Sequence, residues 1–434
     1  MSIYSYEEAF GASDKTTTAM RDALKAWLSA YYGESNSGQD PCQRIAYCIV
    51  DKILKAMFGE YKLSTADPVF SQVFRTLDES RREAVQTMLV NGESYLKPCP
   101  TEDGFAFTVI PRENVLIFAR DETGAPTDIG TAEKSTYGNS YYTLLERRRL
   151  DENGLLTIEN KLYRSEDGTG AGNQVPLSEN PRYQGLSESY RYPEAMGLGL
   201  VRLKTPILNC VDGSRDGVAI FAAAMSLIEN IDRNEYLLSQ EFERGQSRVF
   251  ASADLLDPDS GKLSAGLFVG LDDDPEHTGM TVYSPALRQE AFLDRKQEYL
   301  RNVESIIGMR RGMLSDANIA DRTATDITSS AVDFNLTVIQ LQQVWDRAVA
   351  ETAALCCKLG KSYRIPGIPA ETPDYNIDWG NGVLYDEDKT WETYRFMVQD
   401  GLLKPEIALG WRFNLPTETE KDLTAIRQKL MPAT

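Results

Sequence analysis

The pattern of apolar positions before residue 94 is that of helices. Apolar residues recur at helical spacing over three stretches, and glycines or an Asn-Gly pair separate the stretches from one another. We therefore expect helices at 18–32, 42–58 and 68–89. The third one follows an Asp-Pro pair, which is typical of a helix start.

After Gly92 the period of the pattern changes to two, which is typical of strands with one buried face. The segments that alternate in this way, or that are rich in β-branched and aromatic residues, are 94–100, 104–111, 114–120, 141–150 and 155–164. Asp-Glu-Asn-Gly at 151–154 separates the last two segments and is a hairpin signal. The sequence thus predicts an antiparallel β region, followed by a loop rich in Gly, Ser, Glu and Tyr at 165–194.

Two long amphipathic helices bracket a short β segment in the second half of the chain. The first is expected at 214–245, with Ser214 or Asp216 capping its start, and would be roughly 40 Å long at 1.5 Å per residue. Strand-like runs follow at 246–283, and the second helix is expected at 286–307. This order predicts a small β module at the end of a helix pair.

The strongest helical pattern begins after a glycine-bounded loop. Its apolar or small positions are Ile327, Ala331, Phe334, Val338, Leu341, Trp345, Ala348 and Leu355. The opening is crowded with Thr and Ser, which are poor in helix interiors and good in first turns. We expect a sharply capped start, with Asp321 and Asp326 complementing the helix dipole. An ordinary capped helix would share these features.

Charge and composition narrow the class of protein. The 434 residues are 42% hydrophobic, enough for a large core and two or more substructures. The 65 acidic and 46 basic residues give a net charge of −19, which disfavours simple electrostatic binding of nucleic acid. No apolar run reaches the roughly 20 residues of a membrane span, and the start lacks the features of a signal peptide. We expect a cytoplasmic site of synthesis and no membrane.

Signals for catalysis, cofactors or metals are weak. The six cysteines lack metal-ligand spacing and are expected to be free, mostly buried thiols. The single histidine, His277, gives no basis for a catalytic triad, and the acidic run at 272–276 is typical of a solvated turn. Lys361 and Ser362 lack the upstream glycine of a phosphate-binding loop, and the glycines at 168–172 lack dinucleotide-binding spacing. We therefore expect no enzyme, no cofactor and no metal site.

The order of these expected elements is similar to that of one known family. It resembles the portal proteins of tailed bacteriophages, of the siphophage type, and three motifs carry the resemblance. They are Gly217, Ile220, Phe221 and Ala224; Ile307 and Gly308; and the run Thr323, Ala324, Thr325, Asp326 and Ile327. The tail, with Gly401-Leu402 before an acidic last helix, is also similar to that family. The resemblance covers the chain from about residue 40 and is strongest over 214–360.

The resemblance implies an α+β portal fold and a structural ring, usually of twelve copies, at one capsid vertex. Double-stranded DNA would pass through its channel during packaging and ejection. The implied parts are the wing at 1–212 and 323–385, the stem at 213–245 and 285–308, the clip at 246–284, the tunnel loop at 309–322, and a short crown at 386–434. The implied partners are the terminase large subunit, a head-tail adaptor, and the major capsid and scaffold proteins, in a virion assembled in a bacterial host.

The resemblance also implies roles for individual residues. The tunnel loop would present Arg310, Arg311, Ser315 and Asn318 to DNA. Subunits would pack through the stem residues Phe221, Met225, Ile228 and Leu300. The motor would dock on the clip residues Arg248, Phe250 and Phe268. With its glycines and few apolar anchors, the loop is expected to be mobile. The two arginines could instead pair with neighbouring carboxylates.

Three other interpretations remain open at this point. A scaffold or other oligomeric capsid protein without a DNA channel would share the long helices, and ring formation would separate the two. A nucleotide-using enzyme would show ATPase activity. A head-completion protein would usually be shorter and lack the paired stem helices. The acidic balance fits a channel, because a passage for DNA should not bind the phosphates tightly.

Overall fold

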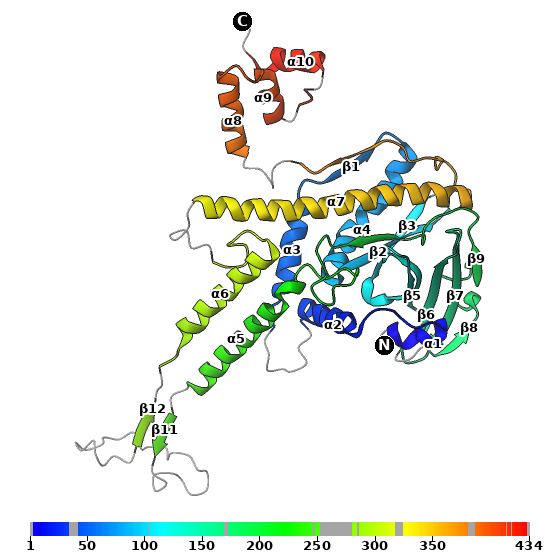
Figure 1. Ribbon diagram of the computed structural model, residues 1–434, viewed down its shortest axis with the longest axis horizontal. Helices are drawn as coiled ribbons and strands as arrows, with labels where there is room; N and C mark the ends of the chain where they lie inside the picture. The colour runs from blue at the N-terminus through cyan, green and yellow to red at the C-terminus, as the bar shows by residue number, and fades with distance from the viewer. Residues whose placement is uncertain are drawn as a thin grey trace, which may run out of the picture.

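The computed structural model describes residues 3–33, 42–102, 104–168, 172–245, 248–251, 280–283, 286–316, 324–380, 387–413, 415–417 and 419–431. Figure 1 shows a broad body of helices and sheets, a pair of helices that leaves it, and three short helices on another side. The predicted α+β class is confirmed. Most apolar side chains of the body belong to one core, which continues into the base of the helix pair.

The three predicted N-terminal helices are confirmed as α2 (Thr18–Tyr32), α3 (Ile45–Phe58) and α4 (Pro68–Asn91), after the short η1 (Ile3–Tyr6) and α1 (Glu7–Phe10). Thr17 caps α2 by accepting from the Met20 N–H, and Asp67 caps α4 in the same way. Helix α3 begins three residues later than predicted, because Arg44 before it has a left-handed backbone with φ of 52°.

The predicted antiparallel β region is confirmed, but it contains more strands than the pattern indicated. One sheet has the order β10-β2-β3, built from β10 (Val201–Lys204), β2 (Glu93–Pro100) and β3 (Phe105–Pro111). The larger sheet consists of β4 (Val115–Arg120), β5 (Pro126–Tyr137), β6 (Ser140–Leu150), β7 (Leu156–Ser165), β8 (Asn173–Val175) and β9 (Ser189–Arg191). The 3-10 turns η2 (Arg112–Asn114) and η3 (Leu177–Glu179) accompany them.

The register supports the predicted hairpin and shows what the pattern missed. Leu150 pairs with Leu156 across the turn, and Gly154 takes a φ of +74°, which favours glycine. Strand β5 was not predicted, and β8 and β9 lie inside the stretch expected to be a loop. A separate two-stranded sheet joins β1 (Lys62–Thr65) to β13 (Tyr375–Asp378), which were also missed.

The helix pair consists of α5 (Met225–Arg244) and α6 (Gln289–Ile307), which run side by side away from the body (Figure 1). Their facing sides bury Ile228, Ile231 and Leu238 of α5 and Leu300, Val303 and Ile307 of α6. Polar contacts join them as well, since Lys296 bonds to Glu235 at 2.9 Å and the Asn234 amide donates to the Phe292 carbonyl at 3.0 Å. At the far end β11 (Arg248–Ala251) pairs with β12 (Met280–Tyr283), as expected for a β module there.

The first long helix starts later than predicted. It begins at Met225 rather than at residue 214, after the 3-10 turn η4 (Ala222–Ala224), and has 20 residues, which is roughly 30 Å. Ser214 and Asp216 do not cap it. The preceding backbone bonds to the body instead, because the Gly217 N–H donates to Glu93 Oε1 at 2.6 Å and the Ile220 N–H to the Leu89 carbonyl at 2.9 Å.

Helix α7 (Ala324–Tyr363) spans 40 residues and lies across the body (Figure 1), in contact with α3, β2 and β10. Its predicted apolar side is confirmed for Phe334, Val338, Leu341, Trp345, Ala348 and Leu355, which are all buried. Asp321, which was expected to complement the dipole of α7, lies outside the described residues. The same role expected for Asp326 stays a prediction. Lys361 and Ser362 lie in the last turn of this helix, so they form no phosphate-binding loop.

The remaining predictions concern the C-terminus and the cysteines. Helices α8 (Glu387–Gln399), α9 (Pro405–Arg412) and α10 (Glu420–Leu430) form the predicted terminal helical unit. All six cysteines are free, but burial was overestimated. Cys356 and Cys357 are buried, Cys42, Cys48 and Cys99 are half-buried, and Cys210 is exposed. His277 and the run at 272–276 lie outside the described residues.

Candidate functional site

The loop after α6 is held by one buried glutamate. Gly308 ends α6 with a left-handed backbone, and the Met309 N–H donates to the Glu304 carbonyl at 2.8 Å. The Glu304 side chain, 0% exposed, accepts from the N–H groups of Gly312, Leu314 and Ser315 at 3.0, 2.6 and 2.9 Å, all on Oε1. Its Oε2 accepts from the Ser315 hydroxyl at 2.8 Å. The chain therefore folds back onto the end of α6.

The residues predicted to face DNA from this loop differ in their exposure. Arg310 and Arg311 are exposed, as contact with an outside partner requires. Ser315 is only 6% exposed and its hydroxyl donates to Glu304, so this arrangement does not favour the predicted contact with DNA, which stays a prediction. Asn318 lies outside the described residues. The described half of the loop is hydrogen-bonded to Glu304, and its predicted mobility stays a prediction.

The predicted stem residues pack within one chain. Phe221, Ile228 and Leu300 are buried in the main core, and Met225 is partly buried against it. The three buried side chains are therefore not free to contact a second subunit. The expectation that subunits pack through these residues stays a prediction, which could rest only on the partly buried Met225.

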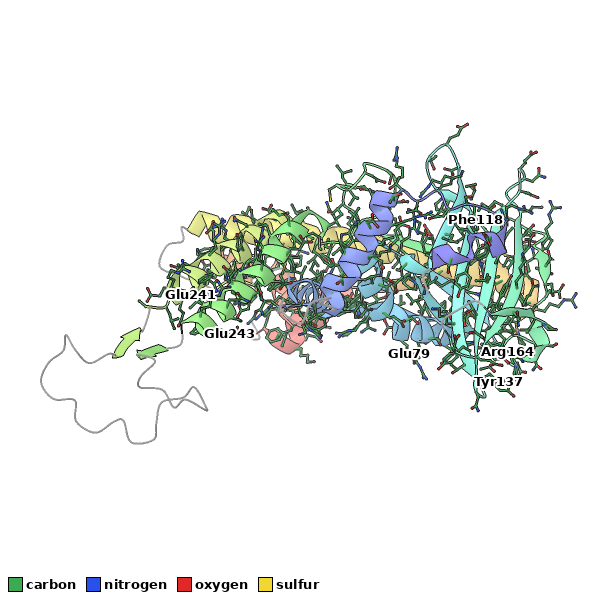
Figure 2. All side chains as sticks on the ribbon, turned by 90° about the horizontal axis from the view of Figure 1, so that it is seen from below. Glu79, Phe118, Tyr137, Arg164, Glu241 and Glu243 are labelled. Carbon is green, nitrogen blue, oxygen red and sulfur yellow. The ribbon has the colours of Figure 1, made fainter. Side chains whose placement is uncertain are left out.

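The outer surface of the helix pair carries many charged side chains, together with the exposed apolar side chains of Leu237, Phe242, Leu293 and Ile306. Helix α5 carries five acidic and two basic residues and α6 carries four and three, and with the buried Glu304 left out the pair has a net charge of −3. Exposed carboxylates include Glu229, Glu243 and Asp294. Figure 2 shows Glu241 and Glu243 near the end of α5 that leads to β11. Arg288 pairs with Glu241 at 2.7 Å, and this hydrogen bond lowers the pKa of the carboxyl.

A buried ionic cluster lies where the helix pair leaves the body. Glu93 of β2, 0% exposed, bonds to Arg202 of β10 and accepts from the Tyr95 hydroxyl at 2.9 Å. Burial by itself would raise the pKa of Glu93, but the charges of Arg202 and Arg112 and the Gly217 N–H lower it to about 2. The carboxylate is thus charged at neutral pH and bridges two strands and the start of the stem segment.

Two glycines allow the backbones to approach each other closely at the same junction. A Cβ built at Gly217 would lie 2.2 Å from the Gly92 carbonyl oxygen, and one at Gly92 would lie 2.3 Å from the Gly217 carbonyl carbon. Gly92 also has a φ of +79°, which favours glycine after α4. The two backbones are therefore in direct contact, with no room for side chains between them.

The β module at the far end is described only as a strand pair. Arg248 stands opposite Tyr283 and Phe250 opposite Thr281 in the register of β11 and β12. Phe268, the third residue expected there, lies outside the described residues. In the part of the chain that the structure describes, no helix has the length and apolar character needed to cross a bilayer.

Sequence reasoning did not find Glu304 or Glu93, and it identified Gly92 only as the end of a helix, not as a contact with Gly217. A signal for Glu304 was present, because it lies four residues after Leu300 and three before Ile307, on the apolar side of α6. A charged residue in such a position needs buried partners. No comparable local signal marks Glu93, whose partners come from residues 202 and 217.

The helix pair with its terminal β strands, set on an α+β body and crossed by a 40-residue helix, defines a structural protein of the portal class. Comparison with known families agrees. The family model described as "Phage portal protein, SPP1 Gp6-like" matches residues 76–429, and the chain belongs to this family. It is therefore a structural protein associated with the phage particle, and the predicted resemblance is confirmed.

No curated protein matches the chain. Among solved structures, a chain described as "Neck of native GTA particle computed with C12 symmetry" is 12% identical, with a TM-score of 0.48. The match covers 95% of this chain and 98% of that one.

Proposed function

We propose that this chain is the subunit of a ring of twelve copies at one capsid vertex, and that the ring encloses the channel for double-stranded DNA. The observation that carries the proposal is the α5–α6 pair, which leaves the body as a self-contained rod with a charged outer surface. Such a rod can line a passage with its charged side chains while much of its apolar side is packed between α5 and α6, and its exposed apolar side chains, Leu237, Phe242, Leu293 and Ile306, would have to face neighbouring copies rather than DNA.

Electrostatics supports a passage rather than a binding site. A ring multiplies every side chain by its symmetry, so twelve copies of a stem with a formal charge of −3 form an acidic stem. Phosphates are held by Lys and Arg that displace counterions, and an acidic wall provides few such contacts. Arg310 and Arg311 would form the basic rings of the channel, at the point where the stem meets the loop.

The other parts follow from the same proposal. Residues 1–212 and 323–385 form the wing, 213–245 and 285–308 the stem, 246–284 the clip, 309–322 the tunnel loop and 386–434 the crown. The clip, with Arg248, Phe250 and Phe268, docks the terminase large subunit during packaging and a head-tail adaptor afterwards. The wing and crown contact the major capsid and scaffold proteins. Synthesis occurs in the cytoplasm of the bacterial host.

Imaging and a packaging assay test the proposal. Electron microscopy and light scattering of the purified protein should give closed rings with a central opening. The double variant Arg310→Ala with Arg311→Ala should assemble normally but alter the rate of packaging or the retention of DNA, with an effect that shrinks as salt rises. A protein that stays monomeric, or rings without an opening, would contradict the proposal. A double variant that loses thermal stability but packages normally would remove these arginines from the channel.

A further inference from the structure

Resting on the proposed channel, we propose that Glu304 is a positioning residue that sets where Arg310 stands relative to the stem. The carboxylate does not itself reach DNA, because it is fully buried at the end of α6. It acts through the loop backbone, which it holds at several points.

The first step is that both sides of Arg310 are tied to Glu304. On one side the Met309 N–H donates to the Glu304 carbonyl at 2.8 Å, and the Met309 side chain is buried in the core. On the other side the Gly312 N–H donates to Glu304 Oε1 at 3.0 Å. A turn closes between these points, since the Met313 N–H donates to the Arg310 carbonyl at 3.2 Å. The backbone of Arg310 therefore has little freedom while these bonds persist.

The second step is that the folded loop needs a carboxylate at residue 304 as its hydrogen-bond acceptor. Three backbone N–H groups converge on Oε1 and a hydroxyl on Oε2, and buried N–H groups without a partner are costly. Gly312 permits the convergence with a φ of +88°, which other residues rarely adopt. An apolar side chain at residue 304 would fit the core but would leave the three N–H groups without this acceptor.

The third step is that the anchored loop lies against another long helix. A Cβ at Gly308 would be 3.1 Å from the Thr337 hydroxyl of α7. The turn that carries Arg310 thus starts where the end of α6 meets the side of α7 at Thr337, and Glu304 holds it there. In the proposed ring each copy would present Arg310 from an equivalent fixed backbone, which would place twelve guanidinium groups at one level of the channel.

Hydrogen exchange tests the anchoring without any assumption about DNA. In assembled protein, Glu304→Ala should speed exchange of the amides at 312, 314 and 315 by at least about tenfold, as expected for losing one hydrogen bond or more. Glu304→Gln, which keeps one acceptor oxygen, should lie between Glu304→Ala and the wild type. The control is Glu298→Ala, an exposed carboxylate of the same helix, which should leave these rates unchanged. Unchanged exchange in Glu304→Ala would overturn the proposal.

A packaging assay then tests the link to Arg310. Glu304→Ala should reproduce the effect of Arg310→Ala on DNA retention, and the double variant should be no worse than either single variant. If Glu304 only stabilises the fold, Glu304→Ala should lower thermal stability and its effect on DNA retention should add to that of Arg310→Ala. Such additive effects would refute the positioning role. If Arg310→Ala has no effect on DNA, Arg310 does not act in the channel and the positioning proposal fails, while imaging of the ring still decides whether there is a channel and the exchange result whether Glu304 anchors the loop. If Glu304→Ala does not assemble, Ser315→Ala replaces it, and exchange at 312–315 no faster than the wild type would count against the anchor.

Discussion

Replacing Gly217 by alanine should weaken the junction between the body and the helix pair more than any ordinary surface change. Gly217 lies where the chain leaves the sheet region for α5, and its backbone touches that of Gly92. Its N–H donates to the buried Glu93 carboxylate at 2.6 Å. A methyl group at this point must displace main-chain atoms on both sides of the junction.

The expected loss can be worked from two contributions. The new Cβ would lie 2.2 Å from the Gly92 oxygen and 2.6 Å from Glu93 Cγ, well inside contact distance. Overpacking of this kind typically costs about 1–3 kcal/mol. Moving the backbone apart also weakens the bond to Glu93, and a hydrogen bond to a charged group contributes about 1.5–3 kcal/mol. The free energy of unfolding should therefore fall by about 2.5–6 kcal/mol.

Urea unfolding followed by circular dichroism measures this change. The matched control is Gly185→Ala, because a Cβ at exposed Gly185 meets no atom within 4 Å and the backbone there has an ordinary φ. The control should stay within about 0.5 kcal/mol of the wild type. If Gly217→Ala is as stable as Gly185→Ala, the close contact does not constrain the junction and the reasoning above is refuted.

Two further predictions concern the ionic cluster and the β module. Because the pKa of Glu93 falls from an ordinary 4.5 to about 2, its contribution of about 3 kcal/mol is present above pH 4.5 and is lost as the pH falls toward 2. Glu93→Gln should therefore be less stable at pH 7 and lose less stability than the wild type between pH 5 and 2, and parallel pH curves would contradict this. Replacing 246–284 by a short Gly-Ser linker should leave rings intact in light scattering and abolish packaging in an extract, whereas dispersed rings would mean that this segment holds the assembly together.

The local pattern predicted those elements whose stability depends on nearby residues. Helices α2 and α4 have both an apolar side and caps within three residues, Thr17 and Asp67, so a short window contains the whole signal. Strand β5 was missed for the opposite reason. Gly130 weakens its strand pattern, yet a Cβ there would lie 2.9 Å from the rings of Phe10 and Phe118, so the glycine is required by residues far from it in the sequence.

Long-range pairing explains the other differences. Strands β1 and β13 pair Lys62 with Asp378, and neither four-residue strand is a convincing strand by itself. The segment before α5 reads as helical because its apolar residues have helical spacing, but its N–H groups bond to Glu93 and Leu89. Tertiary hydrogen bonds thus override local propensity at the junction, where the body sets the direction of the helix pair.

The position of the acidic residues refines the argument from net charge. Some carboxylates behind the total of −19 lie inside the protein, where Glu93 pairs with Arg202 and Glu304 accepts from the loop backbone. On the helix pair, Glu235 and Glu241 are neutralised by Lys296 and Arg288. In the proposed channel, repulsion of DNA would therefore come from the exposed carboxylates that remain, such as Glu229 and Glu243. The buried acidic residues hold the backbone at the joints, so only the exposed ones would shape the wall of that channel.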